Sequence, residues 1–333
     1  MIRRLIWTVF VLLVVTLITF MIFYVMPPGD PALTFSQRQV AGGRQPSSEV
    51  FEEVRRQFGL DRSLPEQYGL FLKRLVLGDG GDCPTGIRGC GWPGLGFSLE
   101  SRTAVRQEII ERGPRTISLA LGAAVIWLVV GISVGIVSAL RRRTFTDRLA
   151  MGFVLFGISA PVFWLGLMAL FIFWQKLGIE AVSTGYVNLQ DDPAGWFQHL
   201  ILPWCVLALL FAAFYARMTR GNLIDTMGED FIRTARAKGL PERRVVAKHG
   251  LRAALTPIVT MLGMDLALLV GGAFITEIVF NLQGIGQWAV SSASSSDLPA
   301  LVGITIITAF SVAILNLVVD IAYAFLDPRV RYS

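Results

Sequence analysis

Three acidic residues, Asp265, Glu277 and Asp320, lie within or near strongly apolar stretches of the sequence. An ionised carboxylate is costly in lipid, so such residues normally face the interior of a helix bundle or water. Their chemistry would be either proton or ion coupling, or hydrogen bonds that pack helices together. An ion-coupled carrier would be expected to hold a denser acidic or histidine network inside the membrane than this sequence has. Packing is therefore the favoured interpretation, with ion coupling as the alternative.

Two cysteines, Cys83 and Cys90, lie in a glycine-rich stretch that has eight glycines between Gly78 and Gly96. Their separation permits a disulfide if the segment is exported to an oxidising compartment. Two reduced thiols are the alternative. A zinc site is disfavoured because no histidine or further cysteine accompanies the pair. We predict a disulfide candidate here and no metal site.

The sequence contains no set of residues that predicts catalysis. The phosphate-binding pattern G-x-x-x-x-G-K-[ST] does not occur, so we expect no ATP bound by the usual phosphate loop. The two histidines, His199 and His249, are far apart in the sequence and cannot form a metalloprotease pair. We therefore predict that the chain binds no cofactor of its own and is not an enzyme.

The composition indicates a membrane protein. Hydrophobic residues make up 53% of the chain and charged residues only 16%, with a mean hydropathy of +0.59. A soluble domain has roughly 25% charged residues. The net charge of +6 resides largely in short segments between apolar stretches, where it orients a chain in a membrane. Nucleic-acid binding is correspondingly disfavoured.

Apolar stretches predict an all-α bundle of six transmembrane helices. They are residues 5–25, 115–140, 149–174, 200–216, 257–280 and 301–325. Pro161 is expected to kink the third helix. Residues 26–114 form a large extracytoplasmic segment in which we expect helices near 48–58 and 64–77, and an amphipathic stretch over 100–112 that ends at Gly113-Pro114. We predict a five-helix core over 115–333, with a polar loop over 217–256 between the fourth and fifth helices.

The loop over 217–256 is polar and basic, with nine Lys or Arg residues between Arg217 and Arg252 against four Asp or Glu. This charge places the loop on the cytoplasmic side, as does the Arg triplet at 141–143, so both termini are expected to be cytoplasmic. Gly239 suits the end of a helix and Pro241 the start of the next. We predict a compact helix-turn-helix projection.

The run TARAKGL at 234–240 resembles the cytoplasmic coupling loop of permease subunits of ATP-binding-cassette importers, in the form found in the dipeptide, oligopeptide and nickel branch. Residues 272–286 are similar to the fifth helix and outer loop of that branch, and residues 326–332 to its C-terminal end. The likeness covers nearly the whole chain, although about a dozen residues of the glycine-rich loop are an insertion relative to the family.

The resemblance implies a subunit of the prokaryotic cytoplasmic membrane. It implies a second permease, two ATPase subunits that hold ATP and Mg²⁺, and an extracytoplasmic substrate-binding protein as partners. Short peptides are the expected cargo, with nickel chelates or glutathione as alternatives. An ion-gradient-driven carrier and a non-transporting scaffold are alternatives of other classes.

The same resemblance names candidate site residues in two places. Those that would contact the ATPase subunits are Thr234, Ala235, Arg236, Ala237, Lys238, Gly239 and Leu240. Those of the outer loop near the binding protein would be Gln283, Gly284, Gly286 and Asp297.

Overall fold

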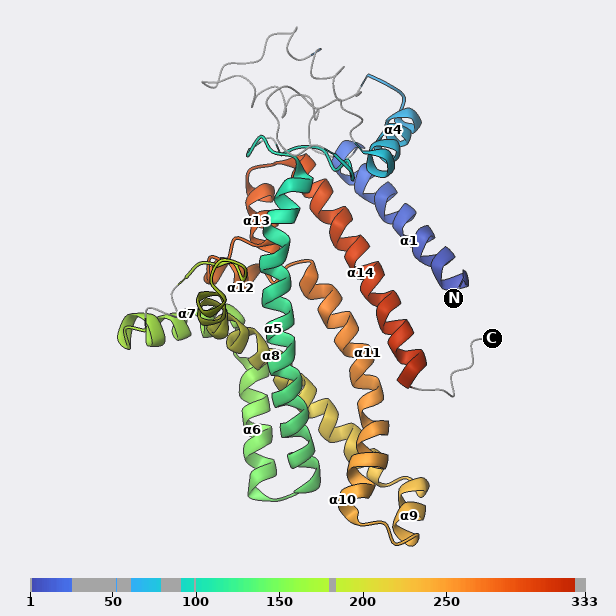
Figure 1. Ribbon diagram of the computed structural model, residues 1–333, viewed down its shortest axis with the longest axis vertical. Coiled ribbons are helices and arrows are strands. Elements are labelled where there is room, and N and C mark those ends of the chain that lie inside the picture. The colour runs from blue at the N-terminus through green and yellow to red at the C-terminus, as the bar shows by residue number, and fades with distance from the viewer. Residues whose placement is uncertain are drawn as a thin grey trace. The chain divides into compact units, whose positions relative to one another are not determined.

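The computed structural model describes residues 2–25, 52, 61–78, 91–98, 100–179 and 184–326 (Figure 1). The described residues are mainly helical, and their one β-type pairing is an isolated bridge between Phe97 and Ala104. The cysteine pair Cys83 and Cys90, the helix expected near 48–58 and the C-terminal residues 327–333 lie outside the described residues. The chain divides into two compact units, one of Met1–Pro114 with Gly284–Ala313 and one of Arg115–Gln283 with Ile314–Ser333.

The first unit is built from helical segments at the beginning of the chain and near its end. They are α1 (Ile2–Phe20), the π-helical η1 (Met21–Val25), α4 (Leu64–Leu77), the start of α5 (Val105–Leu140), α13 (Ile285–Ser294) and the start of α14 (Leu298–Leu326). The predicted helix α4 is confirmed, and the Glu66 carboxylate accepts a hydrogen bond from the Ser63 amide at 3.3 Å. Buried side chains such as Val105, Ile285 and Trp288 form the core of this unit.

Helix α5 begins ten residues earlier than predicted, so the expected stop at Gly113-Pro114 is wrong. The amphipathic stretch before that dipeptide is the first part of the same helix, and Pro114 lies inside it. A proline removes one backbone hydrogen bond but does not have to end a membrane helix, because neighbouring groups can satisfy the freed carbonyl. Burial of Val105 in the first core holds the early turns in place.

The second unit contains the remaining helices. They are the rest of α5, α6 (Phe145–Ser159), α7 (Val162–Leu170), η2 (Phe171–Lys176), α8 (Pro193–Met227), α9 (Asp230–Ala237), α10 (Glu242–Arg244), η4 (Val245–Gly250), α11 (Leu251–Val270), α12 (Phe274–Val279) and the end of α14. Helices α5 and α8 approach closely at Gly131 and Gly135, where an added Cβ would meet α8 atoms within 3 Å. Small residues permit such close packing in membranes.

Among the described residues, five helices are long and apolar enough to cross a membrane. Their apolar parts are Ile6–Phe23, Val105–Leu140, Pro193–Met227, Glu242–Leu269 and Leu298–Val318. Helices α6 and α7 give a sixth span if the bent pair is taken as one, and they meet at 98°. The break falls where Pro161 predicted it, because Pro161 caps α7 in an extended conformation. The all-α membrane fold is thus confirmed.

The predicted continuous helix over 257–280 is wrong. Helix α11 ends at Val270, and α12 is a separate short helix. Gly272 between them has φ of 112°, a backbone conformation that glycine adopts readily and that ends helical geometry. Helix α8 is also longer at both ends than the predicted 200–216, and the Asp192 carboxylate accepts a hydrogen bond from the Ala194 amide at its start.

Candidate coupling site

The loop between α8 and α11 forms the helix-turn-helix that its sequence predicts. Helix α9 ends in a paired set of backbone hydrogen bonds: Gly239 N–H donates to the Arg236 carbonyl at 2.9 Å, and Leu240 N–H donates to the Ala235 carbonyl at 3.4 Å. Gly239 has φ of 74°. This is the glycine-dependent Schellman ending of a helix. It sets the direction in which the chain leaves α9.

A small apolar core holds the turn together. Ile232, Ala235 and Val245 are buried, and Met227 and Leu240 pack against them. Ala235, which the resemblance places in the ATPase contact, therefore has its side chain inside the loop. It can support that contact only by shaping the turn.

The other residues of the predicted coupling set lie mostly on the surface. Thr234, Arg236, Ala237, Lys238 and Gly239 are exposed, and Leu240 is partly buried. The Thr234 hydroxyl donates to the Asp230 carbonyl one turn earlier, at 3.0 Å, and so is occupied within its own helix. The exposed surface at 234–239 thus combines two long basic side chains with a threonine, an alanine and a glycine.

A bidentate ion pair spans the turn. Arg236 Nε donates to Glu242 Oε2 at 3.0 Å, and Arg236 Nη2 donates to Glu242 Oε1 at 2.6 Å. Hydrogen bonding to Glu242 raises the pKa of the Arg236 guanidinium, so the arginine stays charged. A planar guanidinium bound at two points fixes orientation as well as distance. The pair therefore links α9 to α10 in one geometry.

The loop is attached to two long helices of the same unit. Element η4 continues directly into α11, and Gly250 within it lies against Met227 of α8. The Asn222 side-chain amide of α8 donates to the Ala254 carbonyl of α11 at 3.2 Å. In Figure 1, α9 and α10 lie at the same end of this unit as the turn between α5 and α6. A force on the loop would reach α8 and α11 together.

A partly buried ion pair lies near that end of the unit, and the sequence analysis did not predict it. Arg220 of α8 donates through Nε to Asp147 Oδ1 at 2.9 Å and through Nη2 to Asp147 Oδ2 at 3.0 Å. The Ser138 hydroxyl and the Arg143 amide also donate to this carboxylate. Asp147 is 5% exposed. The cluster holds the α5–α6 turn to α8. In the sequence, the one feature that could have indicated this ion pair is an aspartate at the start of an apolar stretch.

The acidic residues singled out in the sequence fall into different settings. Glu277 is fully buried in α12 and accepts a hydrogen bond from the Thr116 hydroxyl at 2.7 Å. Asp265 is partly buried in α11 and accepts a hydrogen bond from Tyr215 at 2.7 Å. Both make the packing hydrogen bonds expected of them. Asp320 lies in α14.

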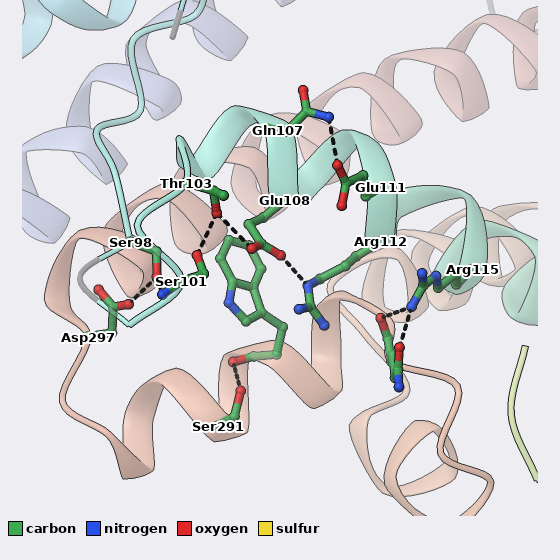
Figure 2. Close-up of polar contacts among 12 residues, drawn as sticks. Ser98, Ser101, Thr103, Gln107, Glu108, Glu111, Arg112, Arg115, Ser291 and Asp297 are labelled. Atoms are coloured by element: carbon green, nitrogen blue, oxygen red, sulfur yellow. Dashed lines mark hydrogen bonds and ion pairs between the residues drawn. The ribbon is translucent and has the colours of Figure 1, made fainter. Parts of the chain in front are cut away.

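Gln283 is the exposed member of the predicted outer set. Arg115 Nη1 donates to its side-chain oxygen at 2.9 Å and to its carbonyl at 3.2 Å (Figure 2). The Arg115 guanidinium also lies over the Tyr186 ring, 5.7 Å from its centroid. Gly284 and Gly286 are buried.

Asp297, predicted to lie in the outer loop near the binding protein, has a buried side chain in the first unit. Its side chain is fully buried and accepts a hydrogen bond from the Ser98 hydroxyl at 2.6 Å (Figure 2) and one from the Glu100 amide at 3.3 Å. Figure 2 also shows Glu108 between Thr103 and Arg112, with bonds of 2.8 and 2.7 Å. These contacts tie residues 98–112 to the start of α14 within the first unit. Asp297 is thus a structural anchor.

The helical bundle and its basic loop define a multi-helix membrane protein. Among solved structures, the chain is similar to the inward-facing MetNI methionine ABC transporter, with a TM-score of 0.52 and 20% identity over 67% of this chain and 97% of that chain. At this identity the likeness supports the fold alone.

Family models and relatives identify the class. The chain belongs to the family described as binding-protein-dependent transport system inner membrane component, whose model matches residues 131–332, and a model for the N-terminal part of that component matches residues 1–120. A peptide transport system permease protein of Brucella abortus (strain 2308) is 38% identical over 97% of this chain and 96% of its own length. The glutathione transport system permease protein GsiC of Escherichia coli (strain K12) is 36% identical over 100% of this chain and 98% of its own length.

The family membership confirms a multi-pass permease subunit of an ATP-binding-cassette importer. The ATPase activity of such a system resides in separate subunits, and a partner permease and a substrate-binding protein complete it. Membership decides against the ion-gradient carrier and the scaffold.

Proposed function

We propose that this permease moves short peptides into the cytoplasm, and that residues 234–240 receive the movement of the ATPase subunits. The observation that carries the proposal is the turn at Gly239. There, glycine in the left-handed backbone conformation, a small apolar core within the loop and a bidentate ion pair occur together and make the turn rigid. Such a projection can transmit displacement with little internal bending. The peptide cargo is supported by the name of the Brucella relative.

In this mechanism ATP binding closes the ATPase pair, and the loop moves as a lever. Its attachment to α8 and α11 carries the movement into the bundle, which alternates between outward-facing and inward-facing states. Cargo with different affinity for the two states couples its transport to the cycle. Both chain termini lie in the cytoplasm, which the basic residues of the loop and of 141–143 support.

Purification of the tagged chain in mild detergent tests the proposal. We expect a second permease, two ATPases and a binding protein to accompany it, identified by mass spectrometry, and short peptides to be released from the binding protein. Glutathione is the second candidate cargo because the Escherichia coli relative carries that name. Recovery of the chain alone, active in vesicles without ATP, would contradict the mechanism.

The Arg236–Glu242 pair provides a separate prediction. Arg236→Glu places two carboxylates across the turn, and we expect ATP-driven peptide uptake by proteoliposomes to fall a few-fold. Reversing both charges with Glu242→Arg in the same chain should restore uptake, because the pair is re-formed. Uptake that is low in the double variant as well would mean that Arg236 acts through another molecule and not through Glu242.

A further inference from the structure

Tyr215 and Asp265 form a polar pair inside the apolar core of the second unit. The Tyr215 hydroxyl of α8 donates to Asp265 Oδ2 of α11 at 2.7 Å, and Tyr215 is 1% exposed. Trp127 of α5 packs beside Tyr215 with ring centroids 6.1 Å apart. The buried Trp127 Nε1 has no hydrogen-bond partner among the described residues. Three helices thus bring polar atoms together where the rest of the core is apolar.

The three residues lie at a similar depth. Trp127 is thirteen residues before the end of α5 at Leu140, and Tyr215 is twelve before the end of α8 at Met227. Asp265 is fourteen residues after the start of α11 at Leu251. At about 1.5 Å per residue these separations are roughly 18 to 21 Å. Tyr215 lies two residues before Arg217, where the predicted apolar stretch of 200–216 ends, so the pair lies toward the coupling-loop end of the second unit.

Asp265 is left with capacity for another partner. In the described part of the chain, Tyr215 is the group that bonds to its carboxylate, and no Lys or Arg forms an ion pair with it. A carboxylate has two oxygens and about four acceptor positions, and this neutral bond uses one of them. A static packing contact would be made equally well by an amide or a hydroxyl, without the cost of a charge in the membrane.

Asp265 also borders a side of α11 that the described residues of the second unit leave uncovered. Met264 and Leu268 flank it on the helix surface and are 56% and 71% exposed. An ionised carboxylate within a membrane-spanning helix is costly in lipid, so Asp residues there face protein or a water-filled cavity. In the assembled transporter this side of α11 therefore does not face lipid at Asp265.

We propose that Asp265 lines the cargo path and binds the cationic α-amino group of a peptide in transit, with Tyr215 as the positioning residue. The proposal rests on the proposed function. An ammonium group has three donors and no acceptor, and it matches a carboxylate that has free oxygens. Charge-assisted hydrogen bonds are stronger than neutral ones, and screening is weak in a buried path. Tyr215 donates to Oδ2 and leaves Oδ1 available as an acceptor.

The test uses the complete transporter in proteoliposomes, with its binding protein and radiolabelled dialanine as the probe. Asp265→Asn keeps the shape and the oxygen that accepts from Tyr215 but removes the charge. We expect it to lower ATP-driven uptake at least tenfold, with assembly and basal ATPase rate unchanged. Asp265→Glu should retain part of the uptake. Leu155→Asn, which adds the same amide at an exposed position of α6, is the control and should transport normally.

Cysteine labelling separates a path from a sealed contact with the partner permease. In a chain with Cys83, Cys90 and Cys205 replaced by alanine, Asp265→Cys should react with a water-soluble methanethiosulfonate in the assembled complex. Dialanine with binding protein should slow this reaction. Absence of labelling in the complex, or normal dialanine uptake by Asp265→Asn, would overturn the proposal. Failure of the unmodified complex to import dialanine at all would instead count against the peptide function.

Discussion

Replacing Gly239 with valine is expected to abolish ATP-driven peptide uptake while the chain still inserts into the membrane. Gly239 has φ of 74°, and a β-branched residue is a strong outlier at positive φ. Left-handed backbone costs an ordinary residue roughly 1–2 kcal/mol, which is enough to shift the turn out of the paired hydrogen bonds that end α9. Uptake and ATPase activity of the reconstituted complex, beside the amount of chain in the membrane, measure the effect.

Gly239→Asn is the matched variant because asparagine tolerates left-handed backbone and is similar in size to valine. No atom of the described chain lies within 4 Å of a Cβ added at this position. Loss of uptake in both variants would therefore mean that another molecule approaches the turn closely. Uptake retained by asparagine alone would locate the effect in the backbone. Normal uptake by Gly239→Val would remove the turn from the coupling mechanism.

Replacing Arg220 with alanine is expected to destabilise the folded chain severely. The change leaves the Asp147 carboxylate buried with its ionic partner gone. Breaking a buried ion pair from one side typically costs about 3–5 kcal/mol. For a chain of this size the melting temperature should fall by on the order of 10 °C. Thermal unfolding of the purified chain in detergent, followed by tryptophan fluorescence, gives the value.

Two further variants define the origin of that loss. Arg220→Lys keeps the charge but cannot reproduce the two-point contact, so it should fall between the parent chain and Arg220→Ala. The double variant Asp147→Asn with Arg220→Met removes both charges and should recover much of the lost stability, because no unpaired charge remains. A double variant as unstable as Arg220→Ala would show that packing of the arginine, and not its charge, holds α8 to the α5–α6 turn.

The resemblance of residues 234–240 to a coupling loop did not distinguish the residues of that loop that are exposed from Ala235, which is buried. Helix ends, charge and the position of Gly239 follow from local rules, and the turn formed as predicted. The burial of Ala235 was not visible in the run TARAKGL, because it depends on Val245, which comes after the turn. Similarly, the burial of the Asp297 side chain could not be predicted from its neighbours in the sequence. Its hydrogen-bond partner Ser98 is 199 residues away.

The sequence by itself determined the class of this protein. The length of the apolar stretches, the low charge and the basic segments between them are local properties, and they control how a chain inserts and orients in a membrane. It also determined the break at Pro161, which follows from a missing amide hydrogen. Only the tertiary structure decided where α11 stops, how sharply α6 and α7 bend, and which carboxylates are paired. The Asp147–Arg220 and Tyr215–Asp265 contacts join residues that are 73 and 50 positions apart. Which side chains meet over such separations depends on how the helices pack.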